Sequence, residues 1–186
     1  GVAVVLACTG KAASNVFGGT LHSFIGYSPS FPFTDYKEDS PALTMWQEKV
    51  RDLQYILIDE RSQLGADLIG FLVRRLKQGF PDRPAHLPTA GVSIILFGDD
   101  FQLGPFSSKR MSDSPHYYVG TGVAKRGPFN SEAQAKVLKL YVENFTTVVQ
   151  LTTNVRAKGE SPEQVLFRRC QMECLRPGLP TDEWHK

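Results

Sequence analysis

The run YILIDERS, Tyr55–Ser62, constrains the fold of this chain more than any other stretch. Its first four residues are apolar and partly β-branched, and two adjacent carboxylates, Asp59 and Glu60, end the run. Such a run is typical of a buried parallel strand. Ligands bind outside the carboxyl ends of strands in open α/β sheets, so we expect Asp59 to reach a hydrated Mg²⁺ and Glu60 to face an attacking water. Taken alone, the same letters also fit an exposed turn with two solvated acids.

Apolar runs and helical spacing alternate along the rest of the chain. Runs at 2–6, 92–97 and 147–151 predict three more strands. Helices are predicted to start at Thr9 and to cover residues 41–53, 64–79, 132–140 and 162–175. The segment 27–40 is interpreted as a surface excursion. The segment 104–130 is interpreted as a long functional or mobile loop that contacts a polyanion. Uniformly apolar strands that alternate with helices predict an α/β fold with a mainly parallel sheet, buried on both faces.

The helix at 64–79 has a clear polarity. Leucines recur at every fourth position, whereas basic residues occupy other positions on the helix. This pattern predicts that the leucine stripe packs in the core and that the basic residues lie outside it. The leucines are Leu64, Leu68, Leu72 and Leu76, and the basic residues are Arg74, Arg75 and Lys77.

Composition excludes some classes of protein. The formal net charge of +2 does not by itself indicate a nucleic-acid binder. Cys8, Cys170 and Cys174 lack the spacing of a metal site, so we expect small buried thiols in a reducing compartment, with no zinc and no disulfide. No apolar run approaches the roughly 20 residues that cross a bilayer, and no membrane is expected. The chain opens within a strand and ends within a helix, so we expect it to be cut from a longer one.

Two short motifs lie between the first and second apolar runs. Thr9-Gly10-Lys11 resembles the end of a phosphate loop, but Val5 and Ala12 stand where that loop needs a glycine and a hydroxyl, so we reject it. The segment 18–23, GGTLHS, offers hydroxyls and an imidazole after two glycines. These groups suit contacts with backbone phosphates, but capping of a short helix is the commoner use of such a segment.

Taken in order, the segments ACTGKAASNVFGGTLHSF, ILIDERS, ILFGDDFQLGP and LTTNVR resemble the Pif-type helicases of superfamily one, the 5′-to-3′ class related to RecD. The order and spacing of the segments carry the resemblance, which spans nearly the whole chain. It implies a RecA-like P-loop NTPase sheet that is incomplete at its N-terminal strand and phosphate loop. It also implies a partial first RecA-like domain over 1–156 and a helical extension toward further domains over 157–186.

The resemblance assigns chemical roles to four residues. The acid that matches Asp59 coordinates Mg²⁺ through water, and the acid that matches Glu60 activates the nucleophilic water. The residues that match Gln102 and Arg156 sense and contact the γ-phosphate of ATP. These residue types are those that phosphoryl transfer to water requires.

The resemblance also implies partners. Thr9, Thr20, His22 and Ser23 match segments that lie along single-stranded DNA, where hydroxyls and amides bind phosphates without reading bases. The implied activity is ATP-dependent translocation on single-stranded DNA and duplex unwinding. DNA junctions and the remaining helicase domains are further expected partners, and DNA repair, recombination and telomere maintenance are the expected processes. The expected location is the nucleus, with the mitochondrion as the alternative.

The chain departs from the family pattern in ways that keep an alternative open. The phosphate loop should precede residue 1, and its strand should occupy the middle of the sheet. Arg61, Gln63, Asp100 and Gly104 replace the residues that are usual at their positions. A degenerate remnant that binds or scaffolds without catalysis, derived from a mobile element, is therefore the second hypothesis. A small-molecule enzyme is the third, but the sequence shows no nucleophile or cofactor motif for it.

Overall fold

A computed structural model describes residues 1–99, 102–105, 131–151 and 159–174 of the chain. The chain divides into two compact units, Gly1–Thr146 and Thr147–Lys186. The domain boundary that we predict after residue 156 lies within 152–158, outside the described residues. Most of the predicted loop at 104–130 lies outside them as well.

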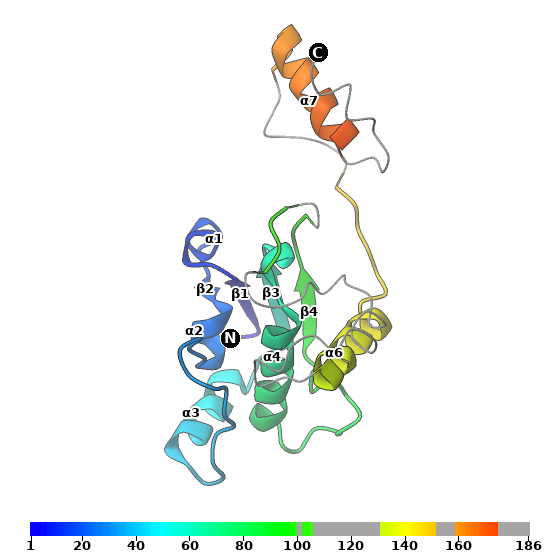
Figure 1. The fold of residues 1–186 in the computed structure, drawn as a ribbon. Coiled ribbons are helices and arrows are strands. Elements are labelled where there is room, and N and C mark those ends of the chain that lie inside the picture. The colour runs from blue at the N-terminus through cyan, green and yellow to red at the C-terminus, as the bar shows by residue number, and fades with distance from the viewer. Residues whose placement is uncertain (100–101, 106–130, 152–158, 175–186) are drawn as a thin grey trace. The chain divides into compact units, whose positions relative to one another are not determined.

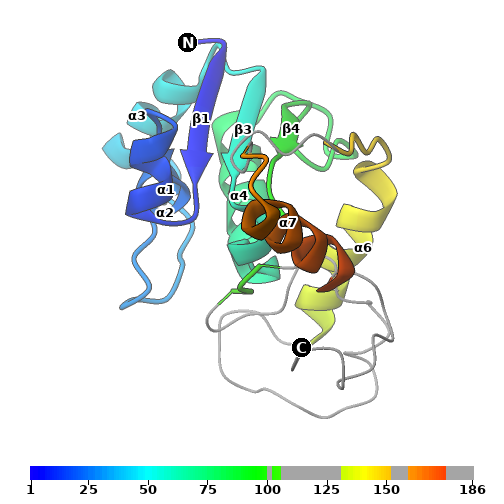
Figure 2. The same ribbon diagram turned by 90° about the horizontal axis from the view of Figure 1, so that it is seen from above.

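A parallel sheet organises the first unit. In the described part of the chain it has four strands in the order β2-β1-β3-β4, all parallel (Figure 1). Viewed from above, β1, β3 and β4 again lie side by side in this order (Figure 2). The prediction of a mainly parallel α/β sheet is confirmed. The strands are β1 (Ala3–Ala7), β2 (Gly19–Thr20), β3 (Tyr55–Asp59) and β4 (Ser93–Leu96).

Helices form at each position that the sequence predicts, and the structure adds η1 and the short helix α2, which the sequence had left open. Those of the first unit are α1 (Gly10–Asn15), α2 (Leu21–Ile25), α3 (Pro41–Val50), the 3₁₀ turn η1 (Arg61–Gln63), α4 (Ala66–Gly79) and α6 (Ser131–Asn144). The second unit contains α7 (Pro162–Cys174). In the part of the chain that the structure describes, no helix combines the length and apolar character needed to cross a membrane.

The main core lies between one face of the sheet and helices α2, α3 and α4. Ile56 and Ile58 of β3 contribute to it from the sheet, and Phe71 contributes from α4. Every leucine of the predicted stripe is buried, so its assignment to the core is confirmed. The four leucines can be buried together because residues four positions apart lie on one face of a helix.

The other face of the sheet is covered only in part. At its carboxyl end, Ala7 packs against two alanines of α1 and is fully buried. Val5, Tyr55, Ile95 and Phe97 remain 37 to 46% exposed. The prediction of burial on both faces is therefore wrong for this face within the described residues. The apolar composition of a strand shows that both of its faces can be buried. Whether a face is buried depends on the helices or loops that pack against it.

The strand predicted at 147–151 is also wrong. These residues form no strand, and Val148, Val149 and Leu151 are 81 to 88% exposed. A strand exists only where a neighbour supplies hydrogen-bond partners, and apolar composition cannot reveal that neighbour. The fourth strand is instead the two-residue β2, whose Gly19 and Thr20 pair with β1.

Arg75 corrects the predicted polarity of α4. We expected it outside the apolar stripe, yet only 2% of its surface is exposed. Its Nε donates to the Ile25 carbonyl at 3.0 Å, its Nη2 to the Thr34 carbonyl at 3.1 Å, and its Nη1 to Gln78 Oε1 at 2.7 Å. Its guanidinium carbon lies 3.6 Å from the centroid of the Tyr36 ring. The side chain therefore joins α4 to the end of α2 and to the excursion at 27–40.

Replacement of Arg75 by Met should lower the free energy of unfolding by about 2–4 kcal/mol, because it leaves buried carbonyls without a donor. The adjacent Arg74 provides a matched control. Its ion pair with Asp35, 2.6 Å long, is about half exposed, so Arg74→Met should cost no more than about 1 kcal/mol. Urea unfolding of the two variants makes the comparison. Equal losses would contradict the anchoring role of Arg75.

Candidate functional site

Two carboxylates lie at the carboxyl edge of the sheet. Asp59 is the last residue of β3, in register with Ala7 of β1, and Glu60 follows it. Asp59 Oδ1 accepts a hydrogen bond from the Glu60 amide at 2.9 Å, and both residues are partly exposed. The acids thus lie at the end of a strand that is hydrogen-bonded on both sides. This is the arrangement that we predict for the run Tyr55–Ser62.

Glu60 has an unusual backbone. Its φ of 57° and ψ of 51° place it in the left-handed region, which costs a residue with a side chain about 1–2 kcal/mol. The chain leaves the strand direction at this residue and enters η1. The next amide, that of Arg61, donates to the Phe97 carbonyl at 2.8 Å. This hydrogen bond fixes the turn to the end of β4, so the Glu60 carboxylate stays at the sheet edge.

Gly98 allows the turn after β4 to approach the turn after β3. Its φ is 148°, and a Cβ at this position would lie 2.6 Å from the Arg61 nitrogen. Only glycine fits such an approach of backbone to backbone. The sequence shows the glycine, but the requirement comes from Arg61, 37 positions earlier in the chain. Arg61 itself, a departure from the family pattern, donates from Nη1 to the Tyr141 hydroxyl at 3.1 Å and so links the turn to α6.

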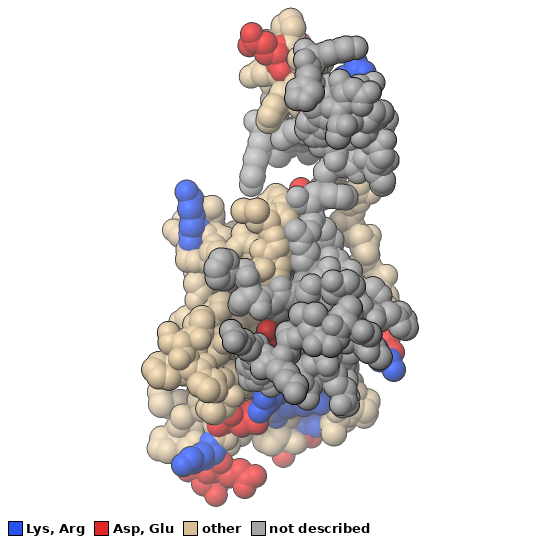
Figure 3. Space-filling view, in the orientation of Figure 1, with Lys and Arg blue, Asp and Glu red and all other residues tan. Residues whose placement is uncertain are grey.

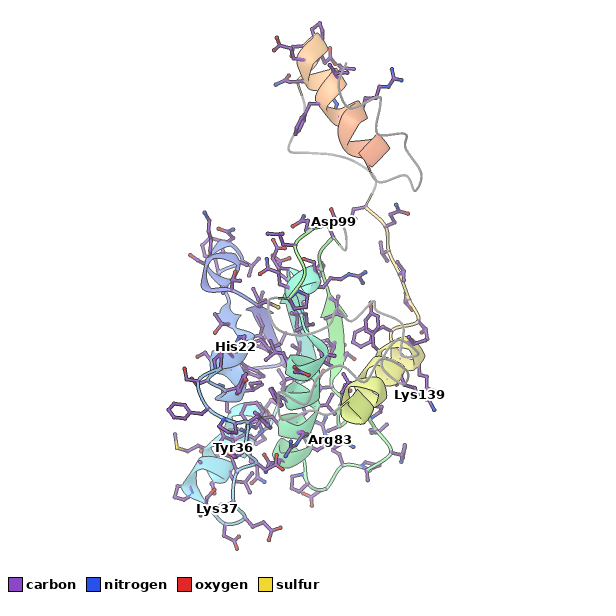
Figure 4. All side chains as sticks on the ribbon, viewed as in Figure 1. His22, Tyr36, Lys37, Arg83, Asp99 and Lys139 are labelled. Carbon is purple, nitrogen blue, oxygen red and sulfur yellow. The ribbon has the colours of Figure 1, made fainter. Side chains whose placement is uncertain are left out.

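Gln102 follows β4 at the same edge. Its amide donates to the Asp99 carbonyl at 3.2 Å, which closes a turn, and Figure 4 shows Asp99 at the upper end of the sheet. Because β3 and β4 are neighbours, the structure brings Asp59, Glu60 and Gln102 to one edge. The proposed γ-phosphate residue Arg156 and the variant position Asp100 both lie outside the described residues.

Cys8 lies beside the acids at the end of β1. Burial, with added repulsion from the Glu60 and Asp59 carboxylates, raises the pKa of its thiol to about 12. The thiol is therefore neutral at physiological pH and cannot act as a thiolate nucleophile. The side chains of Cys170 and Cys174 lie outside the described part of the chain.

The donor set fits a magnesium ion that arrives with phosphates. Mg²⁺ at nucleotide sites takes one or two carboxylates and completes its octahedron with water and substrate oxygens. Asp59 supplies one such carboxylate at the sheet edge. Among the described residues, no group of three or more His, Cys, Asp or Glu side chains is placed to hold an ion.

Two threonines that we predict to contact DNA cap short helices. Thr9 Oγ1 accepts a hydrogen bond from the Ala12 amide at 3.3 Å, and Thr20 Oγ1 accepts one from the Ser23 amide at 3.2 Å. Capping, the alternative left open for the segment 18–23, is thus present at Thr20, and Thr9 caps the helix that we predict to start there. A hydroxyl that accepts one bond keeps its own proton to donate, so capping does not exclude a phosphate contact.

His22 and Ser23 lie in α2, directly after β2. Ser23 is exposed, whereas His22 is half-buried and stacks on Tyr27 with ring centroids 5.6 Å apart and planes at 18°. Burial lowers the pKa of His22 below its ordinary value of 6.5, so the ring is neutral at pH 7. It can donate one hydrogen bond to a phosphate but adds no charge.

The strand register sets the distance between the acids at the end of β3 and the predicted DNA-contact residues after β1 and β2. Thr20 pairs with Ala7, and Ala7 pairs with Asp59, so they are separated by two strand spacings, about 10 Å. On the face shown in Figure 3, charged side chains of the first unit gather mainly at its lower end. Tyr36, Lys37 and Arg83 lie toward that end in Figure 4, away from the carboxyl edge.

Comparison with known proteins identifies homologues of the chain. No protein-family model matches it. It is 33% identical over 111 residues to the ATP-dependent DNA helicase PIF1 of Saccharomyces cerevisiae, which covers 55% of this chain and 12% of that protein. It is 31% identical over 136 residues to the ATP-dependent DNA helicase PIF4 of Trypanosoma brucei brucei, covering 71% of this chain and 16% of that protein. The chain thus corresponds to a small part of the length of these relatives.

Two solved structures of Pif1 helicases are similar to the chain in sequence. A Bacteroides Pif1 in complex with ADP-AlF4 is 34% identical over 58% of this chain and 24% of its own, with a TM-score of 0.46. A Bacteroides Pif1 bound to single-stranded DNA is 32% identical over 57% and 24%, with a TM-score of 0.47. The curated homologues of the chain are Pif-type helicases, so the resemblance that the motifs indicate is confirmed.

Replacement of Gly98 by Ala should lower the free energy of unfolding by about 1–3 kcal/mol, because the new methyl group meets the Arg61 backbone at an unfavourable φ. Gly10 is the matched control. It has open space around its Cα, so Gly10→Ala should change stability by less than about 0.5 kcal/mol. Thermal unfolding measures both variants. A Gly98→Ala protein as stable as Gly10→Ala would show that the close approach is not required.

Acid should weaken the fold through His22. The folded state holds the pKa of this ring below 6.5, so the unfolded chain takes up the proton more readily. The resulting stability is present above about pH 6.5 and is lost as the pH falls through the folded pKa. Unfolding free energies of the parent and His22→Gln between about pH 7.5 and pH 5 test this. We expect a smaller acid loss in His22→Gln, and identical pH profiles would contradict the assignment.

Proposed function

We propose that this chain, whose homologues are Pif1 helicases, is part of the first motor domain of an ATP-dependent DNA helicase that moves 5′-to-3′ on single-stranded DNA. The observation that carries the proposal is the pair of acids at the end of β3. Asp59 and Glu60 end a strand that is paired on both sides, and the strand beside it leads to Gln102. Such an edge suits phosphoryl transfer, which needs rigid placement more than covalent chemistry.

The residues of the edge divide the chemistry between them. A bound Mg²⁺ would supply charge neutralisation at the phosphates, and Asp59 would hold it through water. Glu60 would accept the proton of the attacking water, with its carboxylate fixed by the turn at η1. Gln102 would donate to the γ-phosphate from the neighbouring turn, and Arg156 would stabilise its equatorial oxygens.

The DNA would lie along the ends of β1 and β2. Thr9 and Thr20 would donate their hydroxyl protons to phosphates, and His22 and Ser23 would add contacts from α2. Thr20 lies in β2, which is joined through β1 to the strand that ends in the acids, so a change of nucleotide state would have a short route through the sheet to this DNA contact. Further domains of the helicase would complete the nucleotide cleft. Roles in repair, recombination and telomere maintenance, and a nuclear or mitochondrial location, belong to the same proposal.

The 186-residue chain should bind single-stranded DNA without hydrolysing ATP. No GxxxxGK[ST] segment occurs in its sequence, so no ring of backbone amides is present to hold the β-phosphate. Fluorescence anisotropy with unrelated oligonucleotides should give similar affinities that weaken with salt. Phosphate release with DNA present should equal that of Glu60→Gln. Higher turnover in the parent chain would contradict the predicted inactivity, and a lack of DNA binding would contradict the helicase proposal itself.

Two histidine variants locate the DNA contact. His22→Ala should weaken binding about two- to tenfold, alike for every sequence, because it removes one hydrogen bond to phosphate. His86→Ala is the control, since His86 is exposed in the loop between α4 and β4, at the opposite edge of the sheet. A loss confined to one oligonucleotide would mean base recognition and would contradict the phosphate contact.

The second candidate, a binding remnant without catalysis, makes the same prediction for the isolated chain. The turn at Glu60 favours the motor, because a backbone held in the left-handed region at some cost is a feature of working sites. The parent gene distinguishes the two directly. A strand followed by GxxxxGK[ST] upstream of Gly1 supports the motor, and its absence there supports the remnant.

A further inference from the structure

Phe17, at the end of α1, is a fully exposed aromatic residue. Its relative exposure is 99%, higher than that of Phe31, the exposed phenylalanine of the excursion at 27–40, at 71%. Its backbone is in the left-handed region, with φ of 51°. Burial of a phenylalanine ring normally stabilises a fold, so a ring held wholly in solvent contributes nothing to this one.

The backbone around Phe17 forms a helix-ending motif. The Phe17 amide donates to the Ser14 carbonyl at 3.3 Å, and the Gly18 amide donates to the Ala13 carbonyl at 2.9 Å. This pair of bonds defines a Schellman motif with Phe17 at the left-handed position, where glycine is the usual residue. The structure of α1 would therefore be served better by glycine than by phenylalanine at this position.

The next residue fixes the place of the ring. A Cβ on Gly18 would lie 2.3 Å from the Val5 carbonyl oxygen, so the chain presses directly against β1 there. The helix end is thereby held against the sheet, and Phe17 stands out from it. Thr20 follows three residues later, within about 10 Å along an extended chain.

The surroundings of the ring indicate the kind of partner. The exposed side chains of α1, those of Lys11, Ser14 and Asn15, are polar, so within this described helix no apolar side chain extends the ring into a patch of the size that a protein partner needs. A single aromatic ring beside hydroxyls and a lysine is the combination that binds single-stranded nucleic acid, in which bases stack on rings while phosphates meet donors.

We propose that Phe17 stacks on a base of single-stranded DNA whose phosphates contact Thr20 and Ser23. The inference rests on the proposed DNA binding and adds to it a contact with bases. Every base has a flat face, so the contact adds affinity without sequence preference. It also explains why a phenylalanine occupies a position that favours glycine.

The test uses variants of the 186-residue chain and two oligonucleotides, oligothymidylate and an abasic strand of the same length. Phe17→Gly should keep or raise the melting temperature, because glycine suits the left-handed position. Its affinity for oligothymidylate should fall about five- to hundredfold, which is the usual worth of one stacked base. Its affinity for the abasic strand should be unchanged. Phe17→Trp should restore binding, and Phe31→Gly should bind as the parent chain does.

The outcomes separate this inference from the proposed function. If the parent chain binds neither oligonucleotide, both the proposed DNA binding and the stacking contact are overturned. If the parent chain and Phe17→Gly bind oligothymidylate equally well, only the stacking contact is overturned. Equal losses by Phe17→Gly on the two strands also overturn it, because a contact with the sugar-phosphate backbone would then account for the effect.

Discussion

The pairing of β1 with β3 is the interaction on which the rest of the structure depends. It runs in register from Ala3 with Tyr55 to Ala7 with Asp59, and it places the ends of both strands at one edge. Parallel strands need a crossover of many residues, so this ladder joins segments about 50 positions apart. Every candidate residue in the described part of the first unit is positioned by this ladder or by a strand attached to it. A shift of the register by one residue would turn Asp59 to the opposite face.

Strain at the edge is tolerated because neighbouring contacts compensate for it. Two hydrogen bonds hold the left-handed Glu60: its own amide donates to Asp59 Oδ1, and the Arg61 amide donates to the Phe97 carbonyl. The bond from Arg61 to Phe97 forms only where the end of β4 lies beside the end of β3, whereas the bond from Glu60 to Asp59 is local. The geometry of the acids is therefore a property of the assembled sheet, and the edge is set before any ligand binds. Such preorganisation is what phosphoryl transfer requires.

The helices around the first face connect the edge to the rest of the unit. α2, which carries the proposed DNA-contact residue His22, is held at its carboxyl end by two cations. Lys49 Nζ donates to the Phe24 carbonyl at 3.0 Å, and Arg75 Nε donates to the Ile25 carbonyl at 3.0 Å. These carbonyls have no partner within the helix, and positive charge there also favours the helix dipole. Short helices such as α2 are unstable alone, so these bonds explain its persistence.

The sequence by itself determined the local features of this protein. The acids at the end of an apolar run, the leucine stripe of α4 and the cap at Thr20 follow from neighbouring residues. The order and spacing of four motif segments were enough to indicate the Pif-type relatives. Only the tertiary structure decided the burial of Arg75, the neutral thiol of Cys8 and the place of β2 in the sheet. The physical reason is that burial, pKa and strand pairing depend on groups distant in sequence, such as the carbonyl of Ile25 or the carboxylate of Glu60. No local pattern records which of these groups will lie alongside.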